Sequence, residues 1–118
     1  MTRVFKICFV ITLISFSFNT YSQCNGSQLL CNKKFNKVAY LTTHNAYNSA
    51  QDNFNLPNHN FNIATQLNDG VRGLMIDVYD YFGTPTVYHG SFLLGTEPLQ
   101  TYLTDIKTFL DNNPNEVI

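Results

Sequence analysis

The sequence predicts an α/β fold with a parallel sheet, because strand-like and helix-like segments alternate along the chain. Two observations support this prediction. One segment has the pattern of a strand with two largely apolar faces, and apolar residues recur with the helical period of 3.6 near the end of the chain. In chain order we expect a strand at 38–42, a helix at 62–68, strands at 71–81 and 86–88, a helix from 98 to 113, and the start of a strand at 116–118.

The segment 71–81 has the pattern of a buried strand. Alternate residues share a face, and both faces are largely apolar, as in a parallel strand that is covered on both sides. One face holds Leu74, Ile76 and Val78, and the other holds Met75, Asp77 and Tyr79. Gly83 and Pro85 then mark a turn before the short strand at 86–88.

Both helices have recognisable ends. In the first, Asn60 or Asn62 can cap the start and Gly70 can close the end. The second begins near Pro98, a favoured first-turn residue, and ends at Asn113 and Pro114. Its apolar stripe consists of Leu99, Tyr102, Leu103, Ile106, Phe109 and Leu110.

The chain is too short for a closed barrel of eight strands. About 96 residues follow position 22, whereas such a barrel needs roughly 200–250. We therefore expect residues 23–118 to be the N-terminal, truncated part of a larger TIM-type barrel; the alternative is a complete small α/β domain. Such a fragment is expected to be inactive and poorly folded, because an open half-barrel leaves strand edges uncovered.

Residues 1–22 have the layout of a secretory signal peptide. Arg3 and Lys6 form a basic start, the apolar run 7–18 follows, and Thr20 and Ser22 offer small side chains before a cut after Ser22. The run is short for a membrane span, although an uncleaved anchor or a buried segment is the alternative. The segment predicts a secreted, cell-surface or periplasmic protein.

Charge and cysteine content add two expectations. The formal net charge of −1 gives no electrostatic case for a nucleic-acid partner. Cys8 lies in the signal segment, so Cys24 and Cys31 remain as an even pair in an exported chain. Such a pair predicts a disulfide, and two free thiols are the alternative.

Polar residues follow the predicted strands in a pattern that suits acid–base chemistry. His44 and Asn45 follow the first strand, Asp77 lies in the second, and His89 and Gly90 follow the third. A histidine titrates near neutral pH, so one can take a proton while another gives one. In a parallel barrel the ends of such strands meet at one rim. The set therefore indicates attack on a phosphodiester.

These residues resemble the X region of phosphatidylinositol-specific phospholipase C and its relatives. In that family the first histidine is usually followed by Asn or Asp, and a later histidine sits in a His-Gly pair. The family pattern G-x-R-x-x-E-x-D is similar to the run from Gly70 to Asp77, and the run 109–118 is similar to the stretch that leads into the next strand. The likeness is greatest to secreted, phospholipase-like phosphodiesterases.

The resemblance implies roles for individual residues. His44 would be the general base or a phosphate stabiliser, and His89 the general acid. Asn45 and Asp77 correspond to calcium ligands in the metal-dependent branch, and oxygen ligands suit that ion. Met75 departs from the pattern, because it stands where that branch has Glu and a thioether is a poor ligand for calcium.

Arg72 has two interpretations from the sequence alone. It could bind the substrate phosphate, or it could form a structural ion pair.

The function that these observations favour is a secreted phosphoric diester hydrolase that cleaves an inositol phospholipid or a related phosphodiester. We expect it to be a monomer that touches a membrane surface transiently. One alternative is a glycerophosphodiester phosphodiesterase or an enzyme similar to sphingomyelinase D. Another is a catalytically inactive barrel that serves as a binding module at the cell surface, which the substitution at Met75 favours.

Overall fold

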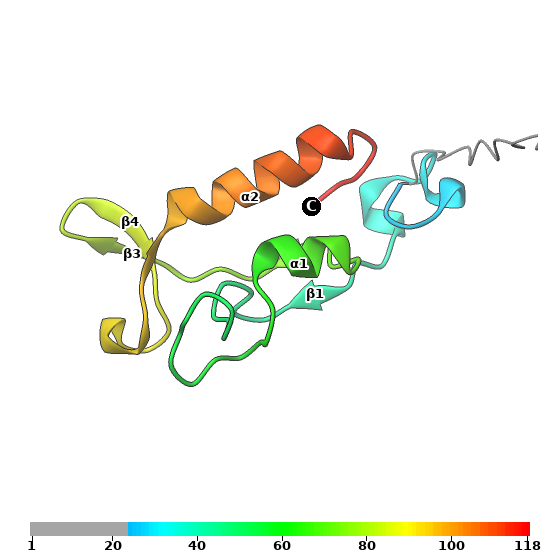
Figure 1. The fold of residues 1–118 in the computed structure, drawn as a ribbon. Coiled ribbons are helices and arrows are strands. Elements are labelled where there is room, and N and C mark those ends of the chain that lie inside the picture. The colour runs from blue at the N-terminus through cyan, green and yellow to red at the C-terminus, as the bar shows by residue number, and fades with distance from the viewer. Residues whose placement is uncertain (1–23) are drawn as a thin grey trace, which may run out of the picture.

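The computed structural model describes residues 24–118, which form a small mixed α/β fold (Figure 1). The predicted signal peptide at 1–22, with Cys8, lies outside the described residues. Two helices and five short strands make up the regular structure of the described part: β1 (Thr42–Thr43), α1 (Ile63–Asn68), β2 (Gly73–Leu74), β3 (Val78–Tyr81), β4 (Thr84–Val87), β5 (Glu97–Pro98) and α2 (Leu99–Asn112), with 3-10 turns at Gln28–Leu30, Phe35–Lys37 and Phe92–Leu94.

β1 and β2 form a parallel pair with Thr42 opposite Gly73. Backbone hydrogen bonds extend this pairing beyond the ends of the two strands. The Met75 N–H donates to the Thr43 carbonyl and the Ala46 N–H donates to the Met75 carbonyl, each at 3.0 Å. A Cβ at Gly73 would collide with the Thr42 side chain, so the close approach requires glycine. The predicted strand at 38–42 is therefore misplaced, since only its last residue lies in β1.

The predicted strand at 71–81 is in fact two strands that belong to different sheets. β3 and β4 form an antiparallel hairpin, and β5 pairs antiparallel with β4. Phe82 and Gly83 form its two-residue turn and have φ values of 50° and 82°, which match the twist of a tight hairpin. Parallel strands need a much longer connection. The expectation of a single parallel sheet was thus wrong, and Pro85 lies within β4 rather than in the turn.

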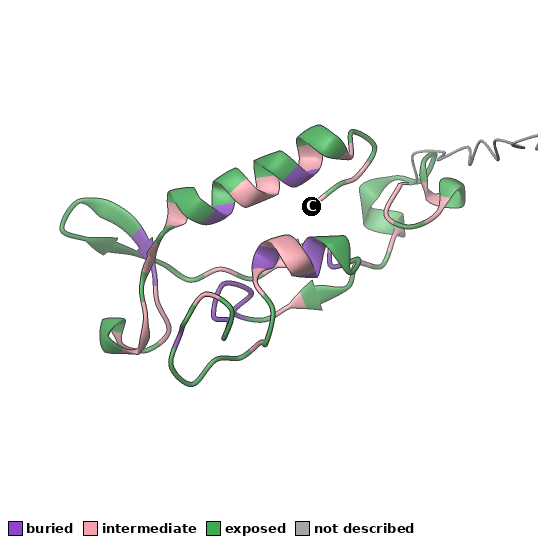
Figure 2. Cartoon of the chain, in the orientation of Figure 1, coloured by how far each residue is buried: buried purple, intermediate pink, exposed green. Residues whose placement is uncertain are grey.

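Both helix predictions are confirmed. The Asn62 side chain caps α1 by accepting a hydrogen bond from the Thr65 N–H at 3.1 Å. α2 begins after Pro98 and ends at Asn113. α1 and α2 lie side by side, and each carries buried residues (Figures 1 and 2). The predicted stripe of α2 faces this core except for Leu103, which is 46% exposed.

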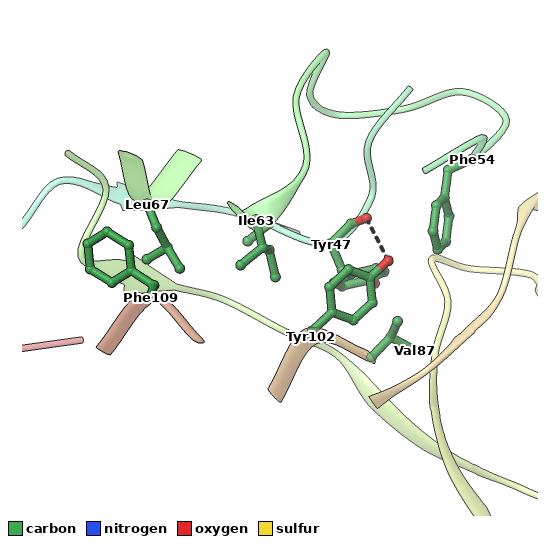
Figure 3. Packing of buried hydrophobic residues seen from close by; sticks show 8 residues of the cluster. Tyr47, Phe54, Ile63, Leu67, Val87, Tyr102 and Phe109 are labelled. Carbon is green, nitrogen blue, oxygen red and sulfur yellow. Dashed lines mark hydrogen bonds between the residues drawn. The ribbon is translucent and has the colours of Figure 1, made fainter. Parts of the chain in front are cut away.

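The core lies between the two helices and the loop that follows β1 (Figure 3). Tyr102 reaches from α2 to this loop, and its hydroxyl donates to the Tyr47 carbonyl at 3.3 Å. The cluster thereby packs the segment after β1 against both helices. Its buried members are Ala46, Tyr47, Phe54, Ile63, Leu67, Val87, Tyr102 and Phe109.

The N-terminal loop is tied to the last residues of the chain. Cys24 and Cys31 form the predicted disulfide, with their Cα atoms 5.0 Å apart. The Asn25 N–H donates to Glu116 Oε2 at 2.9 Å, and Asn25 Oδ1 accepts from the Val117 N–H at 3.0 Å. The strand expected at 116–118 is not formed; the segment binds this loop instead. No helix within residues 24–118 is long and apolar enough to cross a membrane.

Candidate functional site

The candidate site lies at the carboxyl ends of β1 and β2. His44 and Asn45 follow β1 directly, and Asp77 comes three residues after β2. Because the two strands are parallel and in register, these residues leave the sheet at the same edge. This is the edge at which α/β folds commonly bind ligands.

Asn45 joins the two histidine segments. Its Nδ2 lies 3.2 Å from Nδ1 of His89, although 44 positions separate the two residues in the sequence. Asn45 is 1% exposed and has a φ of 52°, a left-handed conformation that Asn tolerates better than most residues. The turn after β1 therefore aims the amide of Asn45 at the segment after β4, and it leaves the neighbouring His44 exposed.

His59 holds the backbone at His44, a contact that the sequence did not indicate. His59 lies between β1 and α1, and its Nε2 lies 2.7 Å from the His44 carbonyl oxygen. A carbonyl oxygen only accepts, so Nε2 of His59 donates this hydrogen bond. The two residues are separated by 15 positions in the sequence, so no local sequence pattern could reveal this contact.

Tyr47 connects Asp77 to the residue before His89. The phenol is fully buried; its hydroxyl donates to the Tyr88 carbonyl at 2.9 Å and lies 3.4 Å from Asp77 Oδ2. Burial, and then the charge of the nearby Asp77, raise the pKa of Tyr47 far above its ordinary value. Tyr47 therefore stays a neutral donor at physiological pH and fixes the position of the segment that carries His89.

Gln66 supports the site from α1. Its side chain is 6% exposed and binds both sides of the dipeptide 44–45: Oε1 accepts from Thr43 Oγ1 at 2.7 Å, and Nε2 donates to the Ala46 carbonyl at 2.8 Å. Nε2 also donates to the Phe61 carbonyl at 2.8 Å. The sequence carries a signal for this role, because Gln66 lies three positions after Ile63 and thus on the apolar face of α1.

Arg72 lies apart from the histidines, before the start of β2. Its Nε lies 2.7 Å from Glu116 Oε2, and both side chains are only about a tenth exposed (10% and 9%). Nη1 donates to the carbonyls of Leu67 and Val71 at 2.6 and 2.7 Å. These contacts favour the structural ion pair over the substrate-binding role that the sequence also allowed.

The residues described do not by themselves make a calcium site. Among residues 24–118, histidine, cysteine and acidic side chains form no group of three or more that could hold a metal ion. Asn45 and Asp77 would supply two oxygen ligands, whereas calcium takes 6–8. Met75 is 51% exposed at the same edge and adds no oxygen. The binding of calcium therefore stays a prediction.

Comparisons with known proteins place the chain in a family. The family model PI-PLC X 1 matches residues 30–118. A PI-PLC X domain-containing protein of Arabidopsis thaliana is 33% identical over 96 residues, which cover 71% of this chain and 22% of that protein. An uncharacterized secreted protein of the fungus Arthroderma benhamiae is 30% identical over 96 residues, which cover 80% of this chain and 22% of that protein.

A third relative is the PI-PLC X domain-containing protein 1 of the same fungus, which is 29% identical over 99 residues; these cover 80% of this chain and 31% of that protein. The chain thus spans between about a fifth and a third of the length of these relatives. No solved structure matches it. The family match covers most of the chain and confirms the resemblance seen in the histidine and Gly70–Asp77 motifs. The chain therefore belongs to the PI-PLC X family.

Proposed function

We propose that the chain carries the histidine pair of a secreted phosphoric diester hydrolase, which cleaves an inositol phospholipid or a related phosphodiester. The observation that carries this proposal is the contact between Asn45 Nδ2 and His89 Nδ1 at 3.2 Å. It brings the segment after β4 to the residue that follows His44, at the edge where Asp77 also lies. Membership of the PI-PLC X family supports the same chemistry.

The reaction requires one proton to be taken and one to be given. His44 would accept the proton of the inositol 2-hydroxyl as that oxygen bonds to phosphorus. His89, carrying a proton on both ring nitrogens, would give one of them to the alkoxide of diacylglycerol as the old P–O bond breaks, and would be left neutral. The products are a cyclic inositol phosphate and diacylglycerol. The exposure of His44 and the partial exposure of His89 are compatible with substrate access.

We also propose that the described residues are the N-terminal part of a TIM-type barrel. The parallel pair β1 and β2 supports this proposal, because both strands end at the edge that carries the candidate residues. In such a barrel, further strands would pair with this sheet and bring further side chains to the same rim. A phospholipid substrate would require transient contact with a membrane surface.

The test is the release of a cyclic inositol phosphate from phosphatidylinositol vesicles by the full-length protein. His44→Ala and His89→Ala should each lower turnover by about 10²–10⁴-fold. Lys107→Ala, which changes an exposed side chain of α2, is the control and should retain the turnover of the parent. If both histidine variants stay within about tenfold of the parent, the acid–base roles are wrong. Parallel assays with a chelator test the requirement for calcium.

A catalytically inactive binding module is the second candidate, and one observation favours it. Met75 stands at the carboxyl edge in place of an acidic residue, and it is half exposed there. Vesicle binding by the full-length protein, with no turnover and no dependence on His44 or His89, would establish this alternative.

A further inference from the structure

Three lysines of the described part lie in one largely exposed loop, residues 29–37, which we call the basic loop. Lys33, Lys34 and Lys37 are all exposed and form no salt bridge within the described residues (Figure 2). The other lysine and the arginine of this part each pair with a carboxylate. The basic loop therefore presents three uncompensated positive charges to the solvent.

Acidic residues are absent from the first part of the sequence. The first of them is Asp52, so all 8 aspartates and glutamates come after β1. Glu116 is brought back to the N-terminal end of the fold, where it accepts from the Asn25 N–H, but its charge is paired with Arg72. The formal net charge of −1 thus hides a separation of charge along the chain. Such a separation favours an anionic partner at the basic loop.

Apolar side chains are exposed beside these lysines. Leu29 is 82% exposed and Phe35 is 63% exposed. The Phe35 ring stacks on the Tyr40 ring with their centroids 4.8 Å apart, and the Tyr40 hydroxyl donates to the Phe35 carbonyl at 3.3 Å. These contacts hold Phe35 in a position where most of its ring faces solvent. Exposed apolar side chains next to lysines are typical of a surface that binds membranes.

A pocket of about 180 Å³ adjoins the basic loop. Its lining combines the cation of Lys33 with the apolar side chains of Leu30, Phe35, Val38, Tyr40 and Val117. A cation in a mostly apolar pocket suits an amphipathic anion, because the charge and the apolar part of such a molecule both find a partner. A nucleic acid or an acidic polysaccharide would use the lysines and leave the apolar lining in water. The pocket therefore favours a lipid.

The basic loop is held in place by its surroundings. Its first residues lie within the ring that the disulfide between Cys24 and Cys31 closes. The loop of this ring is bound to the end of the described chain, since Asn25 Oδ1 accepts from the Val117 N–H at 3.0 Å. A surface that is already ordered loses little conformational freedom on binding.

The basic loop is separate from the candidate site. It lies before the start of β1, whereas His44 follows the end of that strand (Figure 1). It also lies close in the sequence to the predicted signal segment at 1–22, which would lead the chain to a membrane. Contact with a lipid surface at this loop therefore requires none of the residues assigned to catalysis.

We propose that the basic loop binds a membrane surface that carries anionic phospholipids. The attraction comes from charge and apolar contact, so it does not require an inositol head group and does not rest on the proposed hydrolase. A lysine close to an anionic surface strengthens binding by about fivefold, and three of them together by about 10²-fold. Leu29 and Phe35 add apolar contact with the interfacial region of the lipids.

The experiment is co-sedimentation of the full-length protein with vesicles of phosphatidylcholine and phosphatidylglycerol, without inositol lipid. The protein should bind these vesicles and not vesicles of pure phosphatidylcholine. Replacing all three lysines with glutamine should weaken binding by about 10²-fold. Salt at about 1 M, where the Debye length is about 3 Å, should remove most of the binding. Leu29→Ser should weaken it about tenfold, and Leu103→Ser, at an exposed leucine of α2, should not.

Lys34→Glu and Lys107→Glu form a matched pair, because both side chains are exposed and both substitutions change the net charge equally. Lys34→Glu should weaken vesicle binding by more than about tenfold, and Lys107→Glu should leave it close to that of the parent. Equal effects of the two variants would overturn the proposal, because binding would then follow net charge alone. A parent protein that ignores anionic vesicles would also overturn it, even if it binds a soluble polyanion such as heparin.

Discussion

Replacing Arg72 with alanine should destabilise the protein strongly, because Arg72 joins four parts of the fold. Its guanidinium bonds to Glu116, to the Leu67 carbonyl in α1 and to the Val71 carbonyl before β2, and it lies 4.6 Å from the ring centre of Phe109 on α2. Glu116 in turn accepts from the backbone N–H of Asn25. The substitution therefore removes the contact that holds both chain ends of the described part against the helices.

The magnitude follows from the burial of the pair. Removing one partner of a buried ion pair typically costs about 3–5 kcal/mol, since the other charge is left without compensation. The side chains of Arg72 and Glu116 are 10% and 9% exposed, so solvent screens little of this effect. The lost contact with Phe109 adds about 1 kcal/mol. Small domains are stable by only about 5–15 kcal/mol, so Arg72→Ala should remove about a quarter or more of the stability.

Urea denaturation of the parent and the variant measures this loss as the change in unfolding free energy. Lys107→Ala is the matched control: Lys107 and Asp111 also form an ion pair, but their side chains are 73% and 62% exposed. Its loss should cost about 0.5 kcal/mol or less. If Arg72→Ala stays within this range, the structural account of Arg72 is refuted. Lost turnover at unchanged stability would assign Arg72 to the substrate instead.

Two further predictions concern the support of the site and the pH dependence of stability. Gln66→Leu should destabilise the folded protein by about 2–4 kcal/mol, because the carbonyl oxygens of Ala46 and Phe61 lose their hydrogen-bond donor. Thermal unfolding measures this loss, with Gln100→Leu on the exposed face of α2 as the control. An equal effect of both variants would contradict the prediction. Burial, and then the charge of Asp52, raise the pKa of Asp105. The folded state therefore binds this proton more tightly than the unfolded chain, which favours folding at low pH and is lost as the pH rises through the folded-state pKa. Asp105→Asn should accordingly stabilise the protein at pH 7, and this gain should disappear when the pH falls below the ordinary pKa range of carboxyl groups. Denaturation curves at several pH values measure it, and a gain that persists at pH 3 would argue against the assignment.

The strand prediction failed at 71–81 for a reason that lies outside the segment. Its alternating, largely apolar pattern continues from β2 into β3, although β2 pairs with β1 and β3 pairs with β4. Which partner a strand finds depends on residues distant in the chain, and alternation along one segment does not encode that choice. The pair Phe82-Gly83 was the available local signal for a hairpin, because a glycine in a two-residue turn favours antiparallel strands.

The sequence by itself determined the two helices, the disulfide and the histidine motifs, because caps, apolar periodicity and short residue patterns act over a few neighbouring positions. It also placed the chain in the right family. Only the tertiary structure decided which polar side chains support the site. Gln66 and Tyr47 acquire their roles from partners that adjoin them only after folding, since a buried polar side chain must be paired by whichever groups the packed chain brings within reach.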